Sequence, residues 1–111
     1  MIAHAGLLGG GWRQLHFTAF REGVDICVLH QGDEDSATVA VLRYRPGAGV
    51  PRHRHGGLET IIVLDGEQSD DQGTYRAGDV VLNQTDSEHR VWSHKGCAVL
   101  IIWEKPVELL A

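Results

Sequence analysis

The sequence predicts an all-β fold, a small antiparallel β-barrel or jelly roll, and three observations support that prediction. Apolar residues alternate with polar ones or form short β-branched runs, which is the pattern of strands. Clusters of Gly, Asp, Asn and Ser separate these runs at short intervals and favour turns. No long amphipathic helix is evident. Strands and turns are therefore expected to build almost the whole fold.

The expected strands follow one another closely, as in an antiparallel barrel or sandwich. In chain order they are Gln14 to Phe17, Val24 to His30, Thr38 to Tyr44, Arg52 to His55, Glu59 to Leu64, Glu67 to Asp70, Asp79 to Leu82, His89 to Ser93 and Cys97 to Trp103. The turns that divide them read GDEDS, RPGAG, HGG, SDDQG, RAGD and HKG. Their Gly, Pro, Asp and Ser residues favour chain reversal.

The 111 residues are expected to form one domain, since this length is near the commonest domain size. We assign residues 12–105 to the barrel and residues 1–11 to a flexible, glycine-rich lead-in. The tail from Pro106 to Ala111 is expected to add little to the core. Cys27 and Cys97 form no C-x-x-C motif, so we expect two reduced thiols.

The net charge of the chain limits the kinds of partner that it is expected to bind. The composition, 42% hydrophobic and 23% charged, is ordinary for a globular protein, and the formal net charge is -5. A negative net charge argues against binding to nucleic acid or to an anionic membrane surface. The sequence shows no signal-peptide pattern and no apolar run long enough to span a bilayer. We therefore expect a cytoplasmic protein whose partner is a small molecule or another protein.

Three histidines and one glutamate stand out as candidate metal ligands. His53 and His55 are expected to share one face of a strand, because successive side chains point to opposite faces. Two glycines permit a tight reversal, after which Glu59 begins the next strand on the face of its apolar residues. His89 begins a later strand. Three imidazoles and one carboxylate suit a divalent cation such as zinc, iron, nickel or manganese.

An H-x-H pair alone has a simpler interpretation, because histidines are common on the exposed polar face of a strand. Glu59 and His89 are the residues that favour the metal hypothesis over this alternative. A cation that accepts five or six ligands would keep positions open for water or a substrate.

These residues carry a family resemblance. The spacing Gly47-x5-His53-x-His55-x3-Glu59-x6-Gly66 fits the first motif of the cupin superfamily, the RmlC-like proteins, at every position. The resemblance extends over most of the chain, from about Arg43 to Trp103, and this first motif is highly specific.

The second cupin motif is matched in spacing only. Gly78-x10-His89 has the spacing of that motif, but Gln84, Asp86 and Ser93 stand where the family usually has Pro, Gly and Asn. The connecting segment, residues 66–78, is similar to that of ChrR-type cupin domains, a subgroup that includes many free-standing single-domain proteins.

The resemblance implies a cupin barrel, or double-stranded β-helix, with one divalent metal ion held by His53, His55, Glu59 and His89. The zinc-binding anti-sigma module that precedes the cupin in ChrR is not expected, because no H-x3-C-x2-C pattern lies upstream. We therefore do not extend sigma-factor inhibition to this chain. Cupins are commonly dimers, and Trp12 and Trp92, expected outside the barrel, also favour a homodimer or a contact between sheets.

Three functions fit these residues. The first is a metal-dependent dioxygenase acting on a small enolisable compound, as in the similar acetylacetone-cleaving and flavonol-cleaving cupins, with Glu59 as the candidate catalytic residue. With a redox-inert metal, the same site would serve an isomerase or hydratase. The second is a non-catalytic, zinc-binding sensor of the ChrR type that binds a small molecule. The third is a site that only stabilises the fold.

Two further groups of residues have alternative interpretations. Tyr44 could reach the lumen as a proton donor, or pack at a strand end with its hydroxyl in water. Arginines gather between residues 43 and 54, where an anion site is conceivable. We favour a solvated rim in which these arginines pair with the acidic run Asp33, Glu34 and Asp35.

Overall fold

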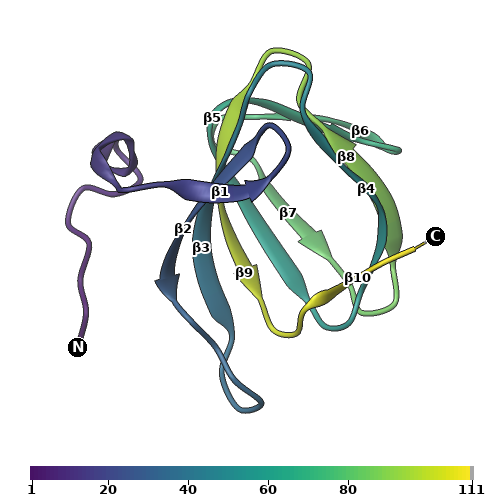
Figure 1. The fold of residues 1–111 in the computed structure, drawn as a ribbon, viewed down its shortest axis with the longest axis horizontal. Helices are drawn as coiled ribbons and strands as arrows, with labels where there is room; N and C mark the ends of the chain where they lie inside the picture. Colours follow the sequence, from purple (N-terminus) through teal and green to yellow (C-terminus); the bar gives the residue numbers. More distant parts are fainter. Residues whose placement is uncertain (111) are drawn as a thin grey trace.

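The computed structural model describes residues 1–110, and their strands form one strongly curled antiparallel sheet (Figure 1). This arrangement confirms the predicted all-β fold. The elements are η1 (Gly11–Gln14), β1 (Thr18–Arg21), β2 (Val24–His30), β3 (Thr38–Tyr44), β4 (Gly49–His55), β5 (Glu59–Asp70), β6 (Gly73–Arg76), β7 (Val80–Asn83), β8 (Glu88–Trp92), β9 (Cys97–Trp103) and β10 (Val107–Leu109).

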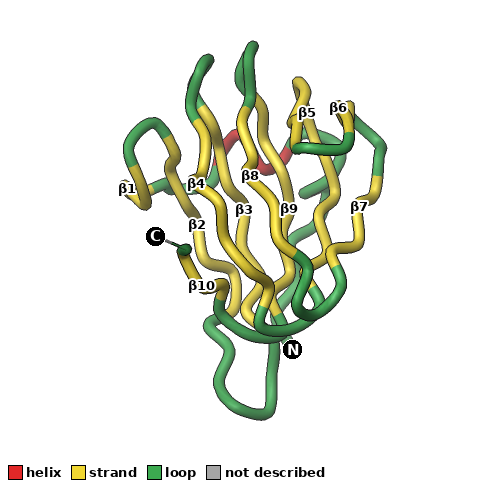
Figure 2. The backbone as a smooth tube through the Cα atoms, turned by 90° about the vertical axis from the view of Figure 1, so that its right-hand side faces the viewer, coloured by secondary structure: helices red, strands yellow, loops and turns green. Residues whose placement is uncertain are grey.

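The strands lie side by side in the order β1-β2-β3-β9-β5-β8-β4-β10, while β6 and β7 pair with β5. Figure 2 shows them running lengthwise beside one another, with the short helix η1 behind the sheet. The sheet curls until β1 and β10, its two ends, contribute to the same pocket. The result is a half-barrel with its interior on the concave side.

The concave side holds the main core. Alternate residues of β3, β5 and β9 point inward, and side chains such as Leu42, Ile61 and Val99 are almost fully buried. Period-two alternation in the sequence produces this face. A second, smaller cluster lies on the other side of the sheet, where Trp12 packs with Val41 and Ala98.

The N-terminal part of the prediction needs correction. The predicted strand from Gln14 to Phe17 is wrong: a single 3-10 turn occupies Gly11–Gln14, and the first strand begins at Thr18. Trp12 is 5% exposed and packs within its own chain, so it is not available for a contact between subunits. Among residues 1–110, no helix has the length and apolarity needed to cross a membrane.

The strand β5 links the two halves of the sheet. The sequence predicted two strands here, but Glu59–Asp70 is one strand of 12 residues. Its first half pairs with β7 and β9, and its second half with β6 and β8. Gly66 lies at the change of partner with a φ of 72°, and a Cβ there would lie 2.2 Å from the Gly96 carbonyl oxygen. Only glycine fits such a close approach of two backbones.

Besides β1, two strands were not expected from the sequence. The strand β6 closes a short hairpin with the end of β5. The strand β10, in the C-terminal tail, pairs with β4 so that Val107 lies opposite His55 and Leu109 opposite His53. The strand that carries two of the candidate metal ligands is therefore flanked on both sides, by β10 and β8.

Candidate metal centre

The four side chains singled out in the sequence converge inside the half-barrel. His53 and His55 come from β4, Glu59 from the start of β5, and His89 from β8. Each of the four offers one ligand atom, and these atoms all lie within 4.8 Å of one another. None of the four residues is more than 6% exposed. The strand ladder explains part of this convergence, because His53 and His89 are direct cross-strand partners.

Hydrogen bonds orient all three imidazoles in the same way. The Nδ1 of His53 lies 2.9 Å from the Pro51 carbonyl oxygen, and the Nδ1 of His55 lies 2.9 Å from that of Ser87. The Nδ1 of His89 lies 3.2 Å from a carboxylate oxygen of Asp70. A carbonyl or an ionised carboxylate can only accept, so each Nδ1 must carry the proton and donate it. Each Nε2 is then left with a free lone pair.

These free nitrogens are the best test of whether a metal ion fits. The Nε2 atoms of His55 and His89 are fully buried and have no hydrogen-bond partner. The His55 Nε2 lies 3.3 Å from Glu59 Oε1, but without hydrogen-bond geometry. A buried polar atom without a partner is costly, and a cation bound by the lone pairs removes that cost. The donor set and its orientation therefore fit a divalent metal ion of the zinc or iron type.

Glu59 is held from both sides by its cross-strand neighbours. Asn83 on β7 and Trp103 on β9 lie directly opposite it in the two ladders. The Asn83 amide donates to Glu59 Oε1 at 3.1 Å, and the Trp103 indole N–H donates to Glu59 Oε2 at 2.6 Å. These bonds fix the carboxylate next to the histidines. Metal-ligating carboxylates are commonly held by such outer hydrogen bonds.

For three of the four side chains, the electrostatics of the cluster favour the protonation state that metal binding needs: Glu59 ionised, and His53 and His89 neutral. Burial lowers the pKa of His53 and of His89. Burial also acts to lower the pKa of His55, but the contact with Glu59 outweighs it and the net shift is upward. Burial acts to raise the pKa of Glu59, but His55 and Trp103 bring it below its ordinary value. An ionised carboxylate beside neutral imidazoles is the form that binds a divalent cation.

The degenerate second motif retains the conformation that it needs. Asp86, which stands where the cupin motif usually has glycine, adopts a φ of 71°. Asp is one of the few residues that tolerates this left-handed region. Ser93, which replaces Asn, is fully buried, and its hydroxyl donates to the Glu67 carbonyl oxygen. The turn before His89 therefore has a left-handed residue where the motif usually has glycine.

Sequence reasoning missed the residues that support the four ligands. Asn83, Trp103, Asp70 and Ser87 were not assigned a role, although each bonds one of the candidate ligands. Only the pairing register reveals them: Trp103 lies 44 residues from Glu59 along the chain. In a single sequence, nothing marks which residues two distant strands will place opposite each other.

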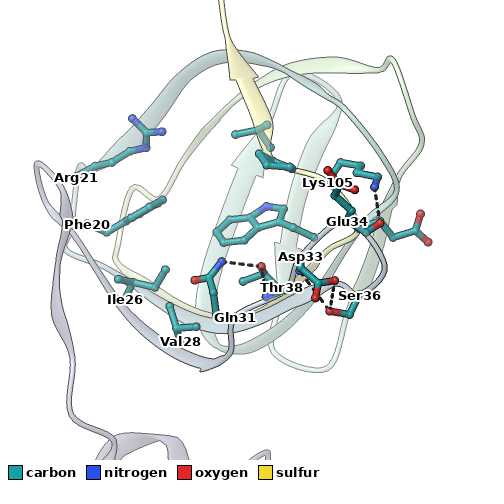
Figure 3. Close-up of a pocket in the computed structure, with 15 residues that line it drawn as sticks. Phe20, Arg21, Ile26, Val28, Gln31, Asp33, Glu34, Ser36, Thr38 and Lys105 are labelled. Carbon is teal, nitrogen blue, oxygen red and sulfur yellow. Dashed lines mark hydrogen bonds between the residues drawn. The ribbon is translucent and has the colours of Figure 1, made fainter.

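A small cavity borders the cluster, and a larger pocket adjoins that cavity. A cavity of about 30 Å³ is lined by His53 and Glu59 together with apolar core side chains. An open pocket of about 620 Å³ lies beside it, a size in the usual range for small-molecule sites (Figure 3). The residues that line both hollows are Phe20, Arg21, Trp103 and Val107.

Tyr44 is inside the barrel. It is 5% exposed and lines the small cavity with His53 and Glu59. Of its two interpretations, the structure supports the position in the lumen and not a hydroxyl in water. Burial raises the pKa of Tyr44, so the phenol is neutral at physiological pH.

The arginines between residues 43 and 54 form ion pairs with carboxylates, as predicted for a rim, but the predicted partners are wrong. The acidic run Asp33 to Asp35 lies in the loop between β2 and β3, away from these side chains. The observed pairs are Arg43 and Arg45 with Asp25, Arg52 with Asp71 and Glu88, and Arg54 with Glu108.

The curled sheet carries a buried cluster of three histidines and a glutamate, and the family model identifies this chain as a cupin. Residues 11–107 match the ChrR cupin-like domain model, and the chain belongs to that family. Over 103 residues it is 32% identical to the anti-sigma-E factor ChrR of Cereibacter sphaeroides. The match covers 90% of this chain but only 41% of that protein, so the chain spans well under two thirds of its curated relative.

Solved structures agree with this assignment. The complex of Rhodobacter sphaeroides SigE with the anti-sigma factor ChrR contains a similar chain, with a TM-score of 0.73 and 27% identity over 82% of this chain and 49% of that one. An acetylacetone dioxygenase from Acinetobacter johnsonii has a TM-score of 0.79 and 17% identity, over 86% of this chain and 72% of that one. At that identity, the second likeness concerns the fold alone.

Proposed function

We propose that the protein binds one divalent metal ion through His53, His55 and His89, with Glu59 as a fourth ligand or a proton acceptor. The observation that carries this proposal is the buried cluster, in which one ligand atom of each residue lies within 4.8 Å of the others and the Nε2 atoms of His55 and His89 have no hydrogen-bond partner. The metal is one of zinc, iron, nickel or manganese, since these cations accept nitrogen ligands with one carboxylate.

We further propose that the bound metal supports oxidation of a small enolisable compound, as in a dioxygenase. A redox metal with open positions supplies binding of the compound and of dioxygen. The protein supplies the surroundings: apolar side chains exclude water, and the pocket gives access from the surface. Glu59 is placed to accept the proton of an acidic C–H group, because hydrogen bonds lower its pKa and keep it ionised.

The test combines metal analysis with oxygen uptake. Protein made without an affinity tag is analysed for its elements, and we expect about one divalent metal ion per chain. The double variant His53→Ala, His55→Ala should lose it, while the matched control His4→Ala, His94→Ala, which removes two exposed histidines, should keep it. Full occupancy of the first variant would contradict the ligand assignment. Iron-loaded protein should then consume oxygen with acetylacetone or a related β-diketone.

The second candidate is a non-catalytic, zinc-binding sensor of the ChrR type. The observation that favours it is sequence identity, since this chain is 32% identical to ChrR and 17% identical to the acetylacetone dioxygenase. In this function the pocket binds a small molecule without converting it. Native zinc, together with no oxygen uptake across a panel of enolisable compounds, would favour the sensor over the dioxygenase.

We also propose that the chain forms a homodimer. Val80 and Leu82 share one face of β7 and are 59% and 60% exposed, and apolar exposure of this kind is typical of interfaces. Light scattering after gel filtration tests the proposal. A monomer mass at micromolar concentration would contradict it.

A further inference from the structure

We infer that the pocket beside the metal centre receives a small organic anion, whose negative head group pairs with the guanidinium of Arg21. The inference rests on the proposed function, because it concerns the ligand of the same site. It depends on the position of Arg21, on its lack of a partner, and on the distribution of charge and apolar surface around the pocket.

A bulge in β1 places two neighbouring side chains on the pocket. In a regular strand, Phe20 and Arg21 would point to opposite faces, yet both line the large pocket and the small cavity. The pairing of β1 with β2 is irregular here: Ala19 lies opposite Asp25, whereas Arg21 lies opposite Val24. Bulges of this kind redirect side chains and are frequent next to functional sites. The Arg21 guanidinium carbon lies 5.1 Å from the centre of the Phe20 ring.

Arg21 differs from most arginines of the chain because it has no carboxylate partner. Within residues 1–110, ion pairs join carboxylates to Arg13, Arg43, Arg45, Arg52, Arg54 and Arg76. Arg21 has none, and its Nε is shielded from solvent without a hydrogen-bond partner. A shielded donor without a partner costs roughly 1–3 kcal/mol, more when charged. An anion bound in the pocket would satisfy this donor.

The other walls of the pocket indicate which non-polar part the ligand has and how the ligand is oriented. Apolar side chains of Phe20, Ile26, Val28 and Trp103 line it and favour an aromatic or alkyl body. Acidic side chains of the loop between β2 and β3 lie at the end of the pocket away from Arg21 (Figure 3). An anion is therefore attracted at one end and repelled at the other. Glu104 and Lys105 also line the pocket, and the Lys105 ammonium donates to the Glu34 carbonyl oxygen.

Arg21 also connects the pocket with the metal centre. It lines the small cavity together with His53, Glu59 and Tyr44. A head group held by Arg21 therefore lies next to the candidate ligands, with its apolar body extending into the larger pocket. A carboxylate on an aromatic or alkyl chain is the simplest ligand with these properties, because a guanidinium binds a carboxylate through two parallel hydrogen bonds.

The experiment uses two probes of the same shape, 3-phenylpropionate, which is charged, and 3-phenylpropionamide, which is neutral. Their affinities are measured by calorimetry on the protein as purified and after removal of metal with a chelator. The variants are Arg21→Met and Arg21→Gln, which remove the charge, and Arg21→Lys, which keeps it. The matched control is Arg13→Met, because Arg13 also lies over its own aromatic neighbour, Trp12, but outside the pocket. Circular dichroism checks that each variant is folded.

We expect the wild type to bind the carboxylate about ten-fold more tightly than the amide, with and without metal. Both charge-removing variants should abolish this preference, Arg21→Lys should keep part of it, and Arg13→Met should keep all of it. The inference is overturned if the preference survives in Arg21→Met and Arg21→Gln, if it disappears on metal removal with Arg21 intact, or if neither probe binds. If the chain binds no divalent metal in the metal analysis but still shows the Arg21-dependent preference, the proposed function fails while this inference stands.

Discussion

At the scale of single residues, groups outside the four-residue cluster orient the candidate metal ligands. The three Nδ1–H groups donate hydrogen bonds to Pro51, Ser87 and Asp70. The Glu59 carboxylate accepts hydrogen bonds from Asn83 and Trp103. Each hydrogen bond fixes the orientation of one imidazole ring or of the carboxylate. Together these orientations bring the candidate ligand atoms close enough to bind one cation. Outer bonds of this kind typically change metal affinity by about 10- to 100-fold when removed.

Trp103→Phe tests one of these bonds. The change keeps an aromatic ring but removes the indole N–H that donates to Glu59 Oε2. The carboxylate is then less firmly held, and we expect metal affinity to fall about ten-fold. Titration with Zn²⁺ against a chelating dye measures the affinity. Trp92→Phe is the matched control and should bind as the wild type; equal affinity in both variants would show that the indole bond does not support the site.

Cys97→Ala tests a buried thiol through the pH dependence of stability. Burial raises the pKa of Cys97 from 9.0 to about 11. The unfolded chain loses this proton near pH 9 and the folded chain only near pH 11, so stability is complete below pH 9 and falls as the pH rises between these values. Two pKa units correspond to about 2–3 kcal/mol.

The wild type should therefore lose about 2–3 kcal/mol more than Cys97→Ala between pH 8.5 and pH 11, measured by urea unfolding. Tyr44, whose pKa burial also raises, is present in both proteins and cancels in the difference. Parallel pH profiles for the two proteins would contradict the prediction.

The four candidate ligands could be predicted from the sequence because their spacing is local within two motifs. His53, His55 and Glu59 lie within seven positions of one another, and the strand period places the two histidines on one face. Trp103, Asn83 and Arg21 could not be predicted. Their positions depend on cross-strand register and on a bulge, which arise only when distant segments pair.

At the scale of elements, the sequence predicted best the strands that pair with another strand on both sides in the interior of the sheet. The bounds of β2, β3 and β9 coincide with the predicted segments. The differences occur at the ends of the chain and at glycines. A 3-10 turn replaced the first predicted strand, β10 formed in a segment too short for a periodic signal, and β5 continued through Gly66 instead of stopping there.

Gly66→Ala tests whether β5 needs a glycine to continue through position 66. The new Cβ would lie 2.2 Å from the Gly96 carbonyl oxygen, in a backbone with a φ of 72°. We expect a loss of about 4 kcal/mol or more, because the start of β9 has to move. Gly47→Ala is the matched control, since its φ is 85° but nothing lies within 4 Å of the new Cβ. It should lose only about 1–2 kcal/mol for the strained backbone. Urea unfolding measures both, and equal losses would exclude the steric explanation.

At the scale of the whole molecule, we expect metal binding and folding to be coupled. The four candidate ligands come from β4, β5 and β8, which converge only in the folded chain. A cation that binds the native state but not the unfolded chain stabilises the fold by mass action.

We expect Zn²⁺ at about one hundred times its dissociation constant to add about 2.7 kcal/mol, or about 10 °C in Tm, for a domain of this size. A chelator should reverse the shift. The double variant His53→Ala, His55→Ala should show no shift, whereas His4→Ala, His94→Ala should respond as the wild type. A full shift in the first variant would mean that the metal binds elsewhere.

The loop between β2 and β3 has a consequence for how this protein could diversify. It extends beyond the ends of the strands (Figure 1) and forms one wall of the pocket, but none of the four clustered side chains belongs to it. If the pocket binds the proposed ligand, insertions or substitutions in this loop should change ligand preference while leaving the candidate metal centre in place. Relatives that share the histidine motif can differ in the compound they recognise, and comparing this loop among them is a direct way to group them by ligand.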